Sequence, residues 1–272
     1  MFFDFLSLFL TLLIFWRQPC IILFMLSLLT LLLVLCELGF PTLMLCIVYP
    51  FSHKAALFWS DYITRRSARM LFSILGKYRK FDLIGDEESK KNLPSQFIVI
   101  SNHQSLLDIV VYLVYFADRV RFVAKDSLNS VPMVGKMLRT QGHCMIPRRG
   151  SPSVAMKSID KFGKRMLDYG KCPVIFPEGT RSRDGNLGTF YAAGFRRLCE
   201  ATKLPVVLCA LDGGWKISSL DSIFTNLYRG AYRVKVLKVY DSPGGKEEQL
   251  KILQEAPKLI EKQLEIWRKN EK

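Results

Sequence analysis

The sequence lacks the short motifs of several common enzyme classes. It contains neither a Walker loop nor a Gly-x-Gly-x-x-Gly fingerprint, so nothing in it indicates bound ATP or NAD. It has no Gly-x-Ser-x-Gly elbow, which argues against a serine acyl-enzyme of the hydrolase type. Its seven cysteines include no Cys-x-x-Cys pair and are odd in number, which disfavours a disulfide framework or a zinc site of ordinary spacing.

Charge is almost absent from the first part of the chain. Residues 1–51 carry only Asp4, Arg17 and Glu37, although the whole chain has a net charge of +15. The rest of the chain is therefore strongly basic. A body of this charge favours anionic partners, whether phospholipid, nucleic acid or a phosphorylated substrate.

The uncharged stretch predicts a membrane anchor over residues 1–51, formed by one or two helices or by a hairpin. Residues 20–36 are apolar apart from Ser27 and Thr30. As a helix they would span about 25 Å, close to the roughly 30 Å of a bilayer core. A cleaved signal peptide fits poorly, because Asp4 stands where a basic residue is expected. A pair of buried helices in a soluble domain is the alternative.

Residues 52–80 are basic and amphipathic. Lysines and arginines alternate there with aliphatic and aromatic residues, a pattern that predicts a helix at a membrane interface. The excess of positive charge next to the anchor then places the body on the cytoplasmic face. An ordinary core helix with a solvated basic face is the alternative, and the two can hold together.

Residues 81–272 alternate between strand and helix patterns, which predicts an α/β sandwich with a largely buried sheet. The expected strands are 96–101, 120–125, 142–148, 172–177, 204–210 and 231–240, and the expected helices are 105–116, 131–140, 153–169, 190–203 and 246–270. Polar clusters follow the strands that end near residues 101, 148 and 177. Ligands gather beyond the carboxyl ends of strands in such sheets, so these clusters are the candidate site.

The first cluster contains His103 and Asp108, in a chain with only three histidines. An imidazole can take a proton from an alcohol, and it works better when a carboxylate holds its other nitrogen. His103 is therefore a candidate base and Asp108 the group that orients it. Ser105 and Asp108 also match a helix capping box, so Asp108 can have both roles.

The other two clusters are rich in arginine. In "FPEGTRS", residues 176–182, Gly179 allows a tight turn and Arg181 offers a planar fork for phosphate or carboxylate. A Glu178–Arg181 salt bridge within the turn is the alternative. "MIPRRG" adds Arg148 and Arg149, for which a solvated surface pair is the ordinary expectation.

Together, four segments resemble, in order, the motifs of the 1-acyl-sn-glycerol-3-phosphate acyltransferase family of membrane glycerophospholipid acyltransferases. They are "NHQSLLD" (102–108), "GHCMIPR" (142–148), "FPEGTRS" (176–182) and "LPVVLC" (204–209). The resemblance implies that His103 and Asp108 are catalytic, and that Arg148, Glu178, Gly179, Thr180 and Arg181 bind the acceptor. Pro147 and Leu208 depart from the family pattern without removing a chemically required group.

The resemblance also implies a glycerolipid-acyltransferase-like sandwich over residues 81–272. Its activity would be transfer of a fatty acyl group, from acyl-CoA or acyl carrier protein, to the sn-2 hydroxyl of lysophosphatidic acid. The product is phosphatidic acid. No metal or redox cofactor is expected, because the thioester is already activated, and no nucleic-acid partner is expected. The rivals are a different acceptor, such as another lysophospholipid or glycerol 3-phosphate, and a membrane-anchored lipid-binding protein without catalysis.

Overall fold

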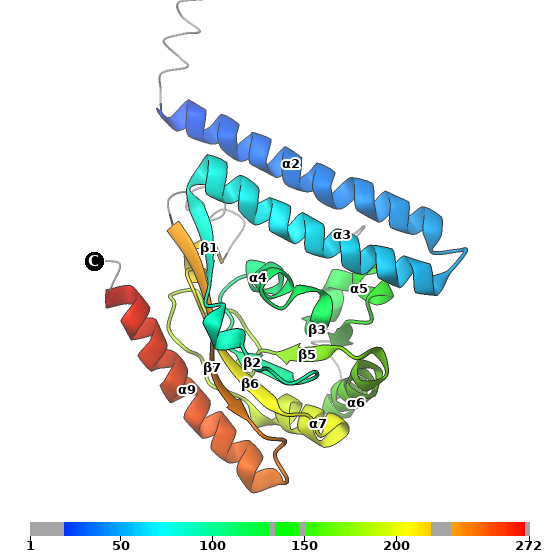
Figure 1. Ribbon diagram of the computed structural model, residues 1–272, viewed down its shortest axis with the longest axis vertical. Coiled ribbons are helices and arrows are strands. Elements are labelled where there is room, and N and C mark those ends of the chain that lie inside the picture. The colour runs from blue at the N-terminus through cyan, green and yellow to red at the C-terminus, as the bar shows by residue number, and fades with distance from the viewer. Residues whose placement is uncertain (1–18, 131–133, 147–150, 219–229, 270–272) are drawn as a thin grey trace, which may run out of the picture.

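A mixed sheet lies at the centre of the computed structural model, with helices on both of its faces (Figure 1). The structure describes residues 19–130, 134–146, 151–218 and 230–269. Within them the sheet has seven strands, in the order β1-β7-β6-β2-β5-β3-β4. The strands are β1 (Phe81–Gly85), β2 (Ile98–Ser101), β3 (Val120–Lys125), β4 (Cys144–Ile146), β5 (Cys172–Ile175), β6 (Val206–Asp212) and β7 (Gly230–Tyr240).

Neighbouring strands run parallel except β6 and β7, which are antiparallel. In the centre, Val99 of β2 lies opposite Val174 of β5 and Val207 of β6. All residues of β2, β5 and β6 are buried, because helices cover both faces of the sheet. The carboxyl ends of β2 and β5 therefore meet at the same edge, and that edge carries the site.

The helices divide between the two faces. Helices α3 (His53–Ile74), α4 (Leu107–Tyr115) and α5 (Val134–Thr140) lie on one side, and α6 (Pro152–Tyr169), α7 (Ala192–Thr202) and α9 (Lys246–Lys269) lie on the other (Figure 1). A hydrophobic core lies on each face of the sheet, and alternate residues of the central strands belong to one core or the other. Val99 packs on the side of α3 and α4, whereas Ile98 and Ile100 pack on the side of α6, α7 and α9. Helix α2 (Pro19–Val48) packs on the outside of α3.

Helix α3 is attached to the body by small and polar side chains. It begins at an N-cap, Ser52, whose hydroxyl accepts the Ala55 N–H, and it continues into a π-helical turn, Leu75–Arg79. Its buried side contains Asp61, whose carboxylate lies 2.5 and 2.6 Å from a guanidinium nitrogen of the fully buried Arg121 on β3. One side of α3 therefore packs against the body, as in the alternative of an ordinary core helix, while Phe58, Trp59 and Tyr62 are exposed.

The α/β architecture predicted from the sequence is confirmed, with several local differences. Strand β1 was not predicted, and the strand expected over 142–148 is described only as Cys144–Ile146. The expected C-terminal helix is present as α9.

The predicted anchor lies partly outside the described residues, since residues 1–18 fall there. Among the positions whose side chains the structure describes, no helix is long and apolar enough to cross a membrane.

Candidate active site

The turn that follows β2 positions the histidine of the first motif. Strand β2 ends at Ser101, and the next residue, Asn102, is fastened to β6 through its side chain. Its amide nitrogen donates to the Leu211 carbonyl at 2.8 Å, and its amide oxygen accepts the Leu211 N–H at 2.9 Å. These two bonds fix the backbone immediately before His103. The histidine therefore leaves the sheet in a set direction.

His103 and Asp108 form a hydrogen-bonded pair. The Nδ1 atom of His103 lies 2.5 Å from Oδ2 of Asp108. The same oxygen accepts the backbone N–H groups of Gln104 at 2.7 Å and Ser105 at 3.1 Å. Asp108 is fully buried, and four polar contacts, with His103, Gln104, Ser105 and Tyr232, hold its carboxylate. One carboxylate oxygen therefore contacts the imidazole and also accepts the Ser105 N–H, although α4 has Leu106, and not Ser105, at its N-cap.

The fourth contact of Asp108 comes from Tyr232 on β7, whose hydroxyl donates to Oδ1. Tyr232 is buried, and burial, with the charge of Asp108 beside it, raises the pKa of the phenol well above its usual value. The phenol therefore keeps its proton and acts as a donor. Sequence reasoning missed this residue, because 124 positions separate it from Asp108 and no local spacing links them.

The imidazole of His103 stacks on Phe176, with the ring centroids 4.2 Å apart and the planes 11° from parallel. Its side chain is 18% exposed, so one edge of the ring can be reached from outside. Since Nδ1 is occupied by Asp108, Nε2 is the nitrogen available to a substrate. This is the arrangement that a general base requires.

The turn after β5 is hydrogen-bonded directly to the His103 backbone. The Glu178 carboxylate accepts the His103 N–H and the Gly188 N–H, both at 2.8 Å, and the His103 carbonyl accepts the Ser182 N–H at 2.8 Å. Burial raises the pKa of Glu178, and the two N–H groups oppose that rise. The first and third motifs thus form one structural unit, in which Glu178 positions the histidine.

Gly179, Thr180 and Arg181 of the third motif lie at the surface. Gly179 has φ of +65°, in the left-handed region that favours glycine, and Thr180 and Arg181 are exposed. The Arg181 guanidinium donates to the Ser218 carbonyl at 2.9 Å. Glu178 binds backbone N–H groups instead of Arg181, so the salt bridge considered as the alternative does not describe this turn. Arg148 lies outside the described residues.

A second support reaches the site from the loop after β6. The Gln104 amide oxygen accepts the N–H groups of Gly214 at 3.0 Å and Trp215 at 3.3 Å. Its amide nitrogen donates to Asp212 at 3.3 Å, and Asp212 is paired with Arg268 of α9 at 2.8 Å. The only sequence signal for Gln104 is its place next to His103. In the described part of the chain, no group of three or more His, Cys, Asp or Glu side chains is arranged to hold a metal ion.

Comparison with known proteins gives a consistent result. The family model described as Acyltransferase matches residues 85–212, which include the first and third motifs. The chain is 28% identical over 177 residues to the 1-acyl-sn-glycerol-3-phosphate acyltransferase of Helicobacter pylori, covering 65% of this chain and 70% of that protein. It is 31% identical to a chloroplastic 1-acyl-sn-glycerol-3-phosphate acyltransferase of Arabidopsis thaliana, over 69% of this chain and 49% of that one.

A human relative, 1-acyl-sn-glycerol-3-phosphate acyltransferase beta, is 33% identical over 54% of this chain and 51% of its own length. The chain thus spans about half the length of the plant and human relatives. Among solved structures, the 1-acyl-sn-glycerophosphate acyltransferase of Thermotoga maritima superimposes with a TM-score of 0.68 at 21% identity, over 88% of this chain and 94% of that one. That likeness supports the fold.

Proposed function

We propose that the chain is an acyltransferase of the family whose model matches residues 85–212, and that it transfers a fatty acyl group to the sn-2 hydroxyl of 1-acyl-glycerol-3-phosphate, giving phosphatidic acid. The family resemblance predicted from the motifs is confirmed, and the relatives carry names of this O-acyltransferase activity. The observation that carries the proposal is the His103–Asp108 pair at the end of β2. The imidazole of His103 has one exposed edge, and the carboxylate of Asp108 is buried and hydrogen-bonded at both oxygens. This arrangement suits removal of a proton from an alcohol.

In the proposed mechanism, Nε2 of His103 takes the proton of the acceptor hydroxyl as the oxygen attacks the thioester carbonyl carbon. The C–S bond then breaks, and the leaving sulfur takes the proton back from His103. Asp108 stabilises the imidazolium that exists between these two transfers. Tyr232 and the two backbone N–H groups hold the Asp108 carboxylate in place beside the charged histidine.

Direct attack is favoured over a covalent acyl-enzyme. The described cysteines of the catalytic body, Cys144, Cys172, Cys199 and Cys209, are all buried. Burial raises the pKa of both the Cys144 and Cys199 thiols to about 12, which makes them poor nucleophiles. The acceptor hydroxyl, activated by His103, is therefore the proposed nucleophile.

The acceptor phosphate is proposed to lie beside the turn after β5. Arg181 is exposed there, and its guanidinium donates to the Ser218 carbonyl. This hydrogen bond restricts the orientation of the guanidinium group, which suits phosphate oxygens. Gly179 and Thr180 leave this surface open, since a Cβ built on Gly179 meets nothing within 4 Å. Arg148 remains a prediction from the second motif, as a further phosphate ligand.

The acyl donor is proposed to be a thioester, acyl-CoA or acyl carrier protein. A thioester carbonyl is already activated, so the scheme needs no metal or redox cofactor. The partners are then the lysophospholipid acceptor, the thioester donor and the bilayer, with no nucleic acid.

A membrane location, with the catalytic body on the cytoplasmic face, is part of the proposal. Helix α2 exposes apolar side chains along its length, and α3 adds exposed Phe58, Trp59 and Tyr62. Basic residues lie on the same helix. Exposed aromatics and cations in one layer are typical of a membrane interface. This would bring the site to the leaflet that contains both lipids.

The test is acyl transfer by the purified full-length protein, with lysophosphatidic acid and labelled acyl-CoA or acyl carrier protein. His103→Ala is compared with wild type, and His53→Ala is the matched control because His53 is exposed at the start of α3. We expect loss of transfer in His103→Ala and full transfer in His53→Ala. Circular dichroism confirms that both variants fold.

Wild-type turnover in folded His103→Ala would overturn the proposed base. Transfer to another lysophospholipid or to glycerol 3-phosphate, in preference to lysophosphatidic acid, would change the acceptor and keep the mechanism. No transfer by wild type with either donor and any of these acceptors would favour the lipid-binding alternative. Association with oligonucleotides at moderate salt would contradict the assignment of the basic charge to lipid.

A further inference from the structure

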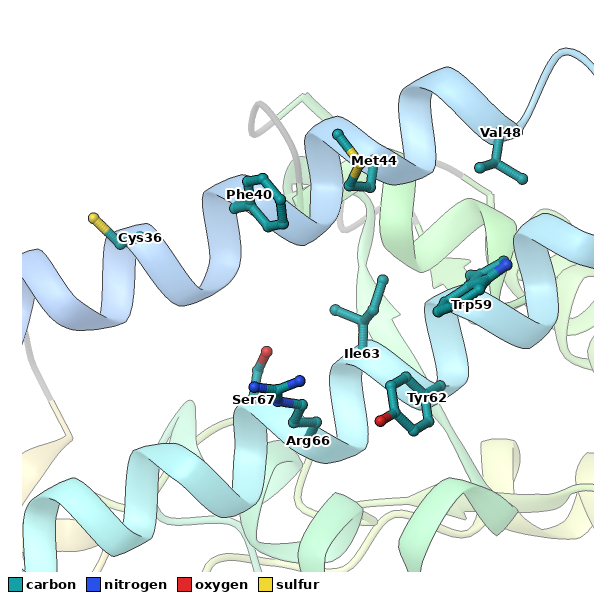
Figure 2. Close-up of a pocket in the computed structure, with 9 residues that line it drawn as sticks. All are labelled: Cys36, Phe40, Met44, Val48, Trp59, Tyr62, Ile63, Arg66 and Ser67. Carbon is teal, nitrogen blue, oxygen red and sulfur yellow. The ribbon is translucent and has the colours of Figure 1, made fainter.

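Helices α2 and α3 do not close against each other along their whole length. Between them lies an open groove with a cavity volume of about 450 Å³, within the roughly 300–1,000 Å³ usual for small-molecule sites. Figure 2 shows the side chains that line it, which come from both helices. We call it the α2–α3 groove. It is separate from the His103 site, whose residues do not line it.

The groove is apolar along most of its length. Helix α2 contributes one stripe at four-residue spacing, Cys36, Phe40, Met44 and Val48, which runs along about 18 Å of helix. Phe40 is 67% exposed even though it lines the groove, so the described residues leave this space open. Large apolar side chains left open in this way mark a site for an apolar ligand.

One end of the groove is basic. Arg66 and Ser67 of α3 lie toward the Cys36 end, and Trp59 lies toward the hairpin end beside Val48 (Figure 2). Arg66 is exposed, and the described residues give it no carboxylate within ion-pair distance. A guanidinium suits phosphate oxygens. The groove therefore has a cation at one end and an apolar channel leading away from it.

We infer that the α2–α3 groove binds one acyl chain of an anionic phospholipid, with the lipid phosphate at Arg66 and the chain extending toward Trp59. The long, narrow, apolar shape fits a single fatty chain, and the cation fits its head group. This inference goes beyond the proposed reaction: the groove is a lipid site apart from the dyad, and it can exist whatever the acceptor of the enzyme is.

Two cysteines of α2 provide the test. Cys36 lines the groove and Cys46 does not, and both are exposed free thiols on the same helix. Full-length protein is purified in a mild detergent and freed of lipid. The rate of N-ethylmaleimide labelling at each cysteine is then measured by peptide mass spectrometry, with and without dioleoyl phosphatidic acid. Cys46 reports any general shielding by detergent or lipid.

Phosphatidic acid at about ten times its Kd should slow labelling of Cys36 about tenfold and leave Cys46 unchanged, because the free fraction falls as 1/(1 + [L]/Kd). Arg66→Ala should raise that Kd about tenfold, which corresponds to about 1.4 kcal/mol. Arg69→Ala is the matched control, an exposed arginine of α3 outside the groove, and it should bind as wild type does. Inorganic phosphate reproduces only the head-group anion and oleyl alcohol only the apolar chain, so each should protect Cys36 weakly or not at all.

A second measurement reports on the other end of the groove. Phosphatidic acid with brominated acyl chains should quench the fluorescence of Trp59, and Trp59→Phe should remove that part of the quenching. The neighbouring Phe58 contacts Trp59 edge-on but does not line the groove, so Phe58→Ala should keep it. His103→Ala should retain both lipid effects, which separates this site from the reaction.

Equal slowing at Cys36 and Cys46 would overturn the inference, because it would mean only that both cysteines lie under a micelle. Protection of Cys36 without any added lipid would also overturn it, since the protein itself would then cover the groove. If the wild-type protein shows no acyl transfer but phosphatidic acid still protects Cys36, the proposed function is contradicted and the lipid site in the groove is supported.

Discussion

The hydroxyl of Tyr232 donates a hydrogen bond to the Asp108 oxygen that does not contact His103. The two oxygens of one buried carboxylate are thereby divided between the base and its support. Tyr232 comes from β7, which is separated from β2 by β6, so a strand that does not neighbour β2 contributes to the site. This contact makes Tyr232 a positioning residue, which acts on the substrate through Asp108 and His103.

Tyr232→Phe should therefore change the pH dependence of the reaction as well as its rate. Without the hydroxyl, more of the negative charge of Asp108 is available to stabilise protonated His103, which is inactive as a base. The acidic limb of the kcat/KM profile should move to higher pH. The rate at its optimum should fall roughly tenfold, the scale expected for one hydrogen bond to a charged group.

Tyr115→Phe is the matched control for this variant. Tyr115 is also a buried tyrosine on the same side of the sheet, but its hydroxyl donates to the Asp86 carbonyl at 2.7 Å, away from the dyad. It should cost stability without moving the pH profile. A profile of Tyr232→Phe that coincides with wild type would refute the positioning role.

Glu178 gives a prediction about stability. Burial raises its pKa in the folded state, so the folded protein binds a proton more tightly there than the unfolded chain does. The stability contributed by Glu178 is consequently present at low pH and is lost as the pH rises from the ordinary carboxyl pKa toward the raised one. Glu178→Gln cannot titrate, so it should gain stability relative to wild type across that window.

Thermal or urea unfolding of the two proteins between pH 4 and pH 7 measures this difference. Glu265→Gln, at an exposed position of α9, is the control and should follow wild type at every pH. A constant gap between Glu178→Gln and wild type over the window would show that Glu178 does not titrate there. Glu178→Gln should also reduce acyl transfer, since an amide oxygen can replace only part of the carboxylate that holds the His103 and Gly188 N–H groups.

The parts of the site that the sequence predicts are those whose signal is local. His103 and Asp108 lie five positions apart, and the turn over 176–182 has its glycine and arginine within a few residues. Their strands are continuous apolar runs, which a strand buried on both faces requires. Strand β1 was missed because it is short, both Asp82 and Ile84 are exposed, and its partner among the described strands is the distant β7.

The contacts that sequence reasoning could not supply are long-range and polar. The aromatic residues Phe58, Trp59 and Tyr62 of α3 are exposed, whereas Ser60 and Asp61 are buried against the body. Asp61 is buried only because it meets Arg121, 60 positions further on. No local periodicity carries that information. The contacts of Tyr232 and Gln104 could not be predicted for the same reason, since their partners lie 124 and 110 positions away in the sequence.

Arg181 is predicted to act on acceptor binding. Arg181→Ala should raise the acceptor KM roughly tenfold, about 1.4 kcal/mol, because the lost guanidinium is exposed and its interaction with phosphate is screened by water. The KM for the thioester should stay the same. Arg183→Ala removes an equally exposed arginine two positions away and should leave both constants unchanged. Equal effects of the two variants would indicate general attraction of an anion by surface charge.

Asp61→Asn is predicted to loosen the attachment of α3 to the sheet. The Asp61 carboxylate is nearly buried against the fully buried Arg121, and the Lys171 ammonium lies 3.1 Å from Oδ2 of the same carboxylate. Removing one partner of a buried pair leaves the other charge uncompensated, which typically costs about 3–5 kcal/mol. The midpoint of urea unfolding should fall accordingly.

Asp118→Asn is the control, because Asp118 contacts the same Lys171 at 3.6 Å but its side chain is 38% exposed. It should cost under about 1 kcal/mol, as surface ion pairs usually do. Similar losses in the two variants would mean that the exposed carboxylate contributes as much as the buried one, and that burial of the Asp61–Arg121 pair is not what holds α3 in place.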